Sequence, residues 1–190
     1  IQPIGHNVML VDMNPESQSI ADYENGVAAH RDYPSMVSSF ASDVADAAEG
    51  DLTSVYKGTV SAYTRSLVYM KPGPVYLFDR VRSAEEHEYN WLFHAEHADG
   101  KNSITYDRDS GRMTIIRPKA RMTMDVVAPD IASSSIRDSD RDEGFLTLSS
   151  APGLKETAFL AAILPESGRG SATPMKTTRT DGGGFIGCRV

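Results

Sequence analysis

The sequence predicts an all-β domain, an antiparallel β-sandwich of stacked sheets with long surface loops and little helix. Apolar and polar side chains alternate along several segments, as they do in a strand with one buried face. Turn-forming residues separate these segments at short intervals. Short strands at such close spacing are typical of a sandwich rather than of βαβ units.

The two clearest strands are Lys119–Val127 and His87–Glu96. In the first, the apolar side chains of one face are Ala120, Met122, Met124 and Val126, and the other face carries Arg121, Thr123 and Asp125. In the second, one face is an aromatic row that we expect to face the core, formed by His87, Tyr89, Trp91, Phe93 and Ala95.

Weaker patterns predict seven further strands: Asn7–Asp12, Val60–Met70, Val75–Val81, Ser103–Asp107, Arg112–Arg117, Phe145–Leu148 and Glu156–Leu164. Lys71-Pro72-Gly73-Pro74 separates two of them and cannot continue a helix. Asp99-Gly100-Lys101-Asn102 and Asp109-Ser110-Gly111 have the composition of hairpin turns.

Helical signals are few. Glu16–Tyr23 has room for a turn or two, and Ser42–Ala48 is rich in alanine but short. The serine-rich segment Ala132–Glu143 and the Gly- and Thr-rich segment Glu166–Gly184 are predicted to be surface loops. Without a repeat or a linker, residues 1–190 are interpreted as one domain.

Composition limits the classes of function. The chain has 190 residues, 40% hydrophobic and 24% charged, and a formal net charge of −7. No apolar run is long enough for a membrane helix, and the basic residues form no stripe with aromatics that would suggest nucleic-acid binding.

Cys188 is the one cysteine, so no internal disulfide is expected, and we interpret its side chain as a small apolar group that fills space in a last strand. The chain opens at Ile1 without a signal peptide, as a processed chain or an excised fragment would.

Two patterns go beyond the fold class. Gly5-His6-Asn7-Val8-Met9-Leu10-Val11-Asp12, followed by Gln18, resembles the His-Asn-Thr-Val-Leu-Val-Asp segment of heparinase II/III-like polysaccharide lyases, with Val8 where Thr is usual. The blocks Gly50–Tyr56, Val60–Pro72 and Val75–Val81, and then Tyr89–His94, are similar to later motifs of the same family in the same order. Together they cover about half of the chain.

The resemblance implies an architecture and an activity. Members of the family have an α/α toroid followed by stacked antiparallel sheets, with the active site in the cleft between them. This chain would be the C-terminal β-sandwich part of a periplasmic or secreted bacterial lyase, with the N-terminal toroid of the same enzyme as its partner. The substrate would be an anionic polysaccharide that contains uronic acid, alginate or a heparin/heparan-type glycosaminoglycan, cleaved by β-elimination.

The resemblance also assigns roles to residues. The main catalytic groups of the family lie before Ile1, so no catalytic residue is assigned here. His6 corresponds to one ligand of a zinc ion that two histidines and an aspartate hold, and the other two ligands would lie upstream. The alternative for His6 is a partly buried, hydrogen-bonded histidine at the start of a strand.

Other candidate residues are interpreted mainly as structural. His94 and His97 are three apart on a strand and so face opposite sides. His30 is a possible substrate contact on a loop. Arg65 faces inward and needs a carboxylate partner, for which Asp79 on the next strand is the candidate. The remaining interpretations are these: Asp51 and Tyr56 organise a turn and a packing contact, Trp91 belongs to the core rather than to a sugar platform, and Gly182-Gly183-Gly184 is no phosphate loop.

Two other functions remain open from the sequence. A non-catalytic carbohydrate-binding module would bind glycan by itself and expose Trp91 or Tyr69. A structural or interaction module would have no metal site and no wide bare apolar surface. The lyase hypothesis, by contrast, expects such a surface where the toroid docks.

Overall fold

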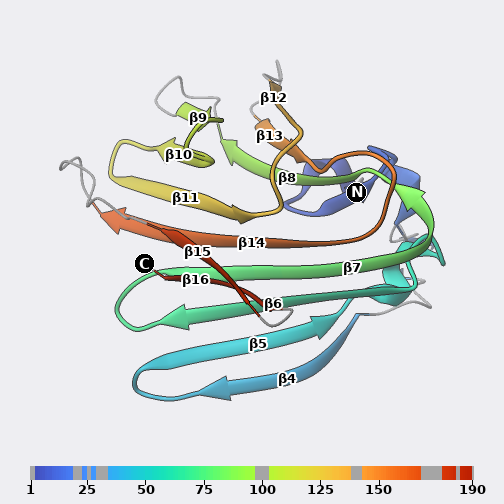
Figure 1. Cartoon of the computed structure of the whole chain (residues 1–190), viewed down its shortest axis with the longest axis horizontal. Helices are drawn as coiled ribbons and strands as arrows, with labels where there is room; N and C mark the ends of the chain where they lie inside the picture. The colour runs from blue at the N-terminus through green and yellow to red at the C-terminus, as the bar shows by residue number, and fades with distance from the viewer. Residues whose placement is uncertain are drawn as a thin grey trace.

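The predicted fold class is confirmed: two antiparallel sheets, of four and eight strands, pack together (Figure 1). The computed structural model describes residues 3–18, 23–24, 27–28, 34–96, 103–137, 143–167, 177–182 and 185–189, and contains no α-helix among them. Nor does this part of the chain contain a helix with the length and hydropathy needed to cross a membrane.

The larger sheet has the order β4 (Ser35–Ala41), β5 (Ala45–Asp51), β6 (Ala62–Met70), β7 (Val75–His87), β14 (Leu154–Ser167), β11 (Ala120–Ala128), β10 (Arg112–Ile116) and β9 (Ser103–Asp107). The smaller sheet has the order β1 (Met9–Val11), β8 (Tyr89–Glu96), β13 (Glu143–Ser149) and β12 (Ser133–Arg137). Two short ribbons pair β2 (Tyr23–Glu24) with β3 (Val27–Ala28) and β15 (Thr178–Gly182) with β16 (Phe185–Arg189). Three 3-10 turns complete the described elements, at Pro3–Gly5, Pro15–Ser17 and Thr53–Tyr56.

The core lies between the smaller sheet and six strands of the larger sheet, β6, β7, β14, β11, β10 and β9. Its largest fully buried side chains include Trp91 and Tyr89 from β8 and Tyr63 and Phe159 from β6 and β14. The predicted aromatic row of β8 therefore faces inward, as expected. Met124 of β11 is also fully buried, and Met122 and Val126 pack around the same core, as expected for that face. The predicted exposure of the other face is only partly right, because Thr123 and Asp125 are buried as well.

Strands β4 and β5 extend beyond this core. In Figure 1 they lie at the end of the larger sheet away from β12 and β13, and none of their described residues belongs to the core clusters. All seven residues of β4 are exposed, and those of β5 are half-buried. This part of the sheet is therefore held by backbone pairing to β6 rather than by burial between two layers.

The alanine-rich segment 42–48 is not helical. Ala45 begins β5, and the Ser42 hydroxyl accepts hydrogen bonds from the backbone of Val44 and Ala45 in the turn before it. Pairing of β5 with both β4 and β6 overrides the helix propensity of alanine. Similarly, Glu16–Tyr23 contributes only the 3-10 turn Pro15–Ser17 and the first residue of β2 among its described residues.

Two predicted loops contain strands. Ser133–Arg137 of the segment 132–143 forms the edge strand β12, and Thr178–Gly182 of the segment 166–184 forms β15. All five side chains of β12 are exposed, so backbone pairing with β13 creates the strand without an apolar face to mark it in the sequence. The expected turns at Lys71–Pro74 and Asp109–Gly111 are confirmed, whereas that at Asp99–Asn102 falls outside the described residues.

Candidate functional site

An arginine–aspartate pair lies at the centre of the polar interior. Arg65 of β6 and Asp79 of β7 are directly opposite in the strand register. The guanidinium donates to both carboxylate oxygens, with Nε–Oδ1 and Nη2–Oδ2 distances of 2.7 Å each. The Asp79 side chain is fully buried, and a bidentate charge-assisted pair of this kind compensates its loss of hydration. The partner predicted for Arg65 is therefore confirmed.

Two more donors converge on the same carboxylate. The Tyr63 hydroxyl lies 3.0 Å and the Trp91 indole Nε1 2.9 Å from Asp79 Oδ2. Burial alone would lower the pKa of Arg65, but its hydrogen bonds to Asp79 and the surrounding charges raise the pKa instead, so the guanidinium stays charged. A fixed buried ion pair is the result.

Tyr56 extends this network toward β1. Its hydroxyl donates to the Met9 carbonyl at 2.6 Å, and Gln18 Nε2 donates to the same carbonyl and to the Tyr56 oxygen. The Tyr56 ring packs edge-on against Tyr63, with 5.2 Å between ring centroids. Burial raises the pKa of Tyr56 and of Tyr63, which keeps both phenols neutral. Tyr56 therefore serves packing, as expected, and Asp51 organises the adjoining turn by accepting from the Thr53 amide.

The network reaches the bend that carries His6. Arg65 Nη1 donates to the Asn7 carbonyl at 3.4 Å, and Asn7 Oδ1 accepts the His94 amide at 2.6 Å. Val8 closes the bend through a 2.9 Å hydrogen bond to the His6 carbonyl. The backbone at Asn7 is thereby tied to both β6 and β8, while the His6 side chain is exposed to solvent.

The described residues do not form a metal site by themselves. No group of three or more His, Cys, Asp or Glu side chains among them is arranged to hold a metal ion. Because His6 is exposed, its imidazole is accessible to a metal whose other ligands come from elsewhere. The residues present thus fit the role of one ligand and not that of a complete zinc site.

Several other candidates have structural surroundings. His94 lies on β8 with its ring 4.9 Å from that of Phe145. Trp91 is only 1% exposed and stacks on Phe159 at 4.7 Å, so it offers no platform to a sugar. Cys188 lies in β16, opposite Arg179. His30, His97 and two glycines of the Gly182–Gly184 run are outside the described residues.

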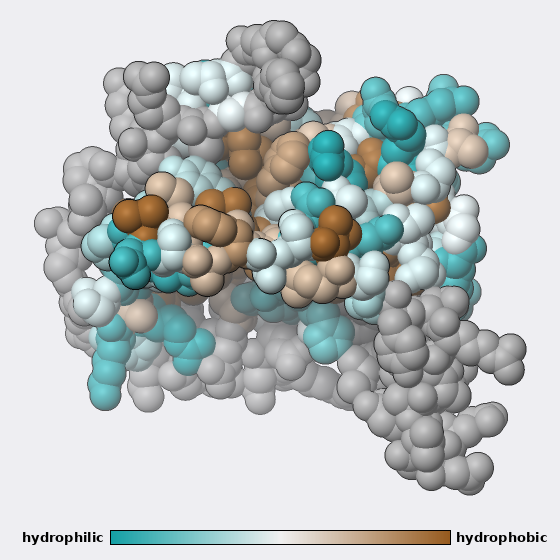
Figure 2. Space-filling view, turned by 90° about the horizontal axis from the view of Figure 1, so that it is seen from below, coloured by the Kyte–Doolittle hydropathy of each residue, from teal (hydrophilic) through white to brown (hydrophobic). Residues whose placement is uncertain are grey.

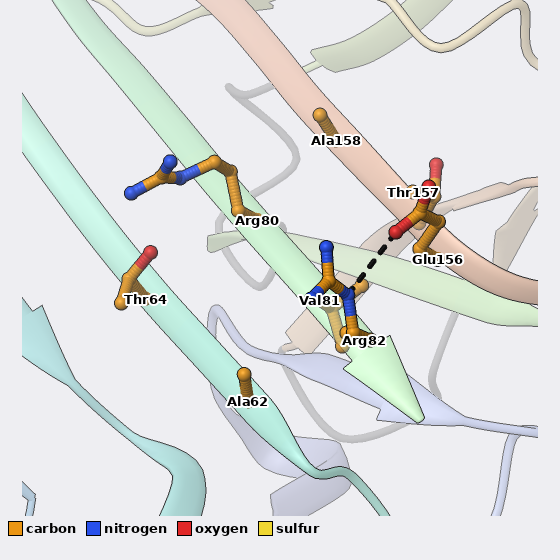
Figure 3. Close-up of a pocket in the computed structure, with 8 residues that line it drawn as sticks. All are labelled: Ala62, Thr64, Arg80, Val81, Arg82, Glu156, Thr157 and Ala158. Carbon is orange, nitrogen blue, oxygen red and sulfur yellow. Dashed lines mark hydrogen bonds and ion pairs between the residues drawn. The ribbon is translucent and has the colours of Figure 1, made fainter. Parts of the chain in front are cut away.

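Sequence reasoning missed an arginine pair on the outer face of the larger sheet. Arg80 and Arg82 project from β7 into an open hollow of about 590 Å³ (Figure 3). Small side chains on the flanking strands leave the space, namely Ala62 and Thr64 on β6 and Ala158 on β14. Arg82 is paired with Glu156 at 3.1 Å, and Arg80 lies over the Phe78 ring at 5.9 Å. The spacing of the two arginines could have revealed the pair, because residues i and i+2 of a strand lie on the same face.

The sequence matches no protein-family model and no curated protein. The fold, however, is similar to part of several solved lyases. Against heparan sulfate lyase HepC from Pedobacter heparinus the TM-score is 0.69 at 11% identity, over 97% of this chain and 27% of that chain. Against the heparinase III BT4657 gene product the TM-score is 0.70 at 11% identity, over 95% of this chain and 27% of that chain. A further heparinase III structure gives a TM-score of 0.65 at 11% identity, over 97% of this chain and 29% of that chain.

This chain thus spans roughly a quarter of the length of the structures that it resembles. At this level of identity, the likeness establishes that the fold is that of a β-sandwich region found in heparinase III lyases.

Proposed function

We propose that this chain is the C-terminal β-sandwich part of a polysaccharide lyase, which supports a catalytic cleft completed by an N-terminal α/α toroid. The substrate is a polysaccharide containing uronic acid, of the alginate or heparin/heparan type, and cleavage is by β-elimination. The single observation that carries the proposal is the fold likeness over nearly the whole chain to the β-sandwich region of heparan sulfate lyase HepC. The motifs at residues 5–12 and 50–94 support it independently.

The surface of the larger sheet supports the division into two parts. Large apolar side chains are exposed on β4, on the turn after it and on β6, and we call them the apolar edge surface: Met36, Val37, Phe40, Val44, Leu67, Tyr69 and Met70. Figure 2 shows brown side chains along this side of the molecule. The strand register places Met36, Leu67 and Tyr69 on one face of the sheet and Phe40 and Met70 on the other, so exposed apolar side chains lie on both sides of this edge. Exposed apolar surface of this kind marks a docking site. The toroid of the same enzyme is the proposed partner.

Zinc is the proposed cofactor, shared between His6 and ligands outside this chain. The exposed imidazole and the tethered Asn7 backbone support this role. When bound, such an ion stabilises negative charge and fixes the geometry of nearby groups. In the proposed enzyme this chain contributes the fixed position of the imidazole, and a periplasmic or secreted location follows from the extracellular substrate.

A carbohydrate-binding module without an enzyme is the second candidate. Tyr69 is 38% exposed and so satisfies one of its expectations, whereas Trp91 is buried and does not. The two candidates differ in the apolar edge surface, which a free-standing module would leave in contact with water.

The decisive experiment compares two proteins on alginate and on heparan sulfate, with ultraviolet absorbance as the readout of unsaturated uronate. The first is this chain alone, and the second is the longest product of the gene that encodes it. We expect product formation only from the longer protein. Cleavage by this chain alone would overturn the division of labour, and an inactive longer protein without helices before residue 1 would overturn the lyase proposal.

A matched pair of variants of the longer protein tests the docking surface. Phe40→Lys places a charge on the apolar edge surface, whereas Ile136→Lys places the same charge on β12, where the side chain is similarly exposed. We expect Phe40→Lys to reduce activity at least tenfold and Ile136→Lys to leave it unchanged. Equal activity of the two variants would exclude the apolar edge surface as the interface.

A further inference from the structure

A second hollow, of about 500 Å³, lies at the end of the larger sheet where β10, β11 and β14 meet. The β10–β11 hairpin closes here through hydrogen bonds in both directions between Arg117 and Ala120. Its two-residue tip is Pro118 and Lys119. The regular β10–β11 ladder that leads to the tip determines which face of the sheet each flanking residue lies on.

The floor of this hollow is apolar. Ile115 and Met122 are directly opposite on β10 and β11, and Pro165 is opposite Met122 on β14. Ile115 and Met122 also pack against the main core, so the floor is anchored from below. A flat apolar floor of this kind can cover the C–H face of a sugar ring.

The rim of the hollow is cationic. Arg117, on the same face as Ile115, and Lys119 at the tip line it. Arg121 and Glu166, opposite each other in the β11–β14 register, also line the hollow but project from the other face of these strands, and Glu166 is the one carboxylate among the described lining residues. Three cations against one anion leave a formal excess of two positive charges, in a chain whose net charge is −7. The hollow is therefore locally positive, whereas the negative net charge of the whole chain repels polyanions at long range.

We propose that this hollow, which we call the hairpin site, binds an acidic polysaccharide directly. Arg117 supplies a planar guanidinium group that matches carboxylate or sulfate oxygens in pairs, and Lys119 adds a point charge. No aromatic ring is among the described lining residues, so the hollow has no stacking platform for nucleic-acid bases. The ligand class is taken from the proposed function, but the site requires neither the toroid nor zinc.

The test measures binding of fluorescent alginate and heparan sulfate hexasaccharides to this chain by anisotropy at low ionic strength. We expect binding that weakens as salt is added, because the rim charges are exposed or half-buried. The double variant Arg117→Gln/Lys119→Gln removes the two positive charges beside the apolar floor and should weaken binding by about tenfold or more. Lys119→Glu changes only the exposed tip and should also weaken it, which keeps the test valid if the double variant fails to fold.

The outer-face arginines provide the matched control. Arg80→Gln/Arg82→Gln removes the same charge from the hollow of Figure 3, in which Glu156 already pairs with Arg82, and should leave hexasaccharide affinity unchanged. The proposal fails if the parent chain binds neither hexasaccharide, if the control weakens binding as much as Arg117→Gln/Lys119→Gln, or if oligothymidylate of equal charge binds as tightly. None of these results would decide the lyase proposal, which is tested separately by the ultraviolet absorbance assay on the longer protein.

Discussion

The indole Nε1 of Trp91 donates to the buried carboxylate of Asp79 at 2.9 Å and so joins the two sheets. Trp91 belongs to β8 of the smaller sheet and Asp79 to β7 of the larger sheet. A single residue, Glu88, separates these two strands in the chain, so β7 and β8 follow each other directly from one layer to the other. Asp79 thus accepts a hydrogen bond from the smaller sheet and also pairs with Arg65, which in turn donates to the Asn7 carbonyl next to His6.

Loss of the Asp79 carboxylate should be severely destabilising. Asp79→Ala leaves the partly buried Arg65 guanidinium and the buried Tyr63 and Trp91 donors without their acceptor, which costs about 3–5 kcal/mol of the free energy of unfolding. The exposed pair Arg82–Glu156 provides the control, and Glu156→Ala should cost at most about 1 kcal/mol. Urea unfolding monitored by Trp91 fluorescence measures both, and equal effects would contradict the role given to the buried pair.

Stability should decline in alkaline solution because of Tyr56 and Tyr63. Burial raises the pKa of both phenols above the ordinary value near 10, so folding favours their neutral form. Their contribution is complete below about pH 10, where the phenols of the unfolded chain are also neutral, and is lost as the pH rises toward the folded pKa values.

The double variant Tyr56→Phe/Tyr63→Phe should be less stable at neutral pH, because Asp79 and the Met9 carbonyl each lose a donor. Its free energy of unfolding should nevertheless fall less steeply between pH 10 and 12. Chemical denaturation at a series of pH values measures the slope, and parallel profiles for parent and variant would count against the assignment.

Trp91 should not report glycan binding. Its ring is 1% exposed and stacked on Phe159, so its emission should be blue-shifted and poorly quenched by acrylamide. Addition of acidic hexasaccharides should leave the emission unchanged even where anisotropy detects binding at the hairpin site. A glycan-dependent shift in emission would revive the hypothesis that an aromatic face binds sugar.

The sequence predicted those features that side-chain alternation marks. The inward-facing row of Tyr89, Trp91 and the half-buried Phe93 follows from period two. The Arg65–Asp79 pair follows from one inward cation that required a carboxylate on the next strand. Strand β12 was missed because its five exposed residues, among them a run of serines, have no apolar face. Strand β5 was missed because alanine favours helices locally, whereas pairing with β4 and β6 decides the outcome.

The sites were less predictable than the fold. His6 was singled out by resemblance alone, since an exposed histidine on a bend has no pattern of its own. Pro165 and Glu166, which line the hairpin site, lie far from Met122 and Arg121 in the sequence and are placed opposite them only by the β11–β14 register. Charges brought together by a strand register of this kind cannot be located before the strand order is known.

Zinc binding should distinguish a shared metal site from a complete one. A single imidazole holds the ion weakly, so zinc should bind the isolated chain without a defined stoichiometry and should not raise its melting temperature. In the longer protein we expect one tightly held zinc ion, which His6→Ala should release.

Asn7→Ala should weaken zinc binding about 10- to 100-fold, because the Asn7 side chain only positions the bend through its hydrogen bond from the His94 amide. His87→Ala, which removes a half-buried imidazole paired with Asp12, is the control and should retain the metal. Metal content by mass spectrometry and affinity by competition with a chelator provide the measurements. Tight, stoichiometric zinc in the isolated chain that is lost with His6→Ala would place the whole site within residues 1–190 and refute the shared arrangement.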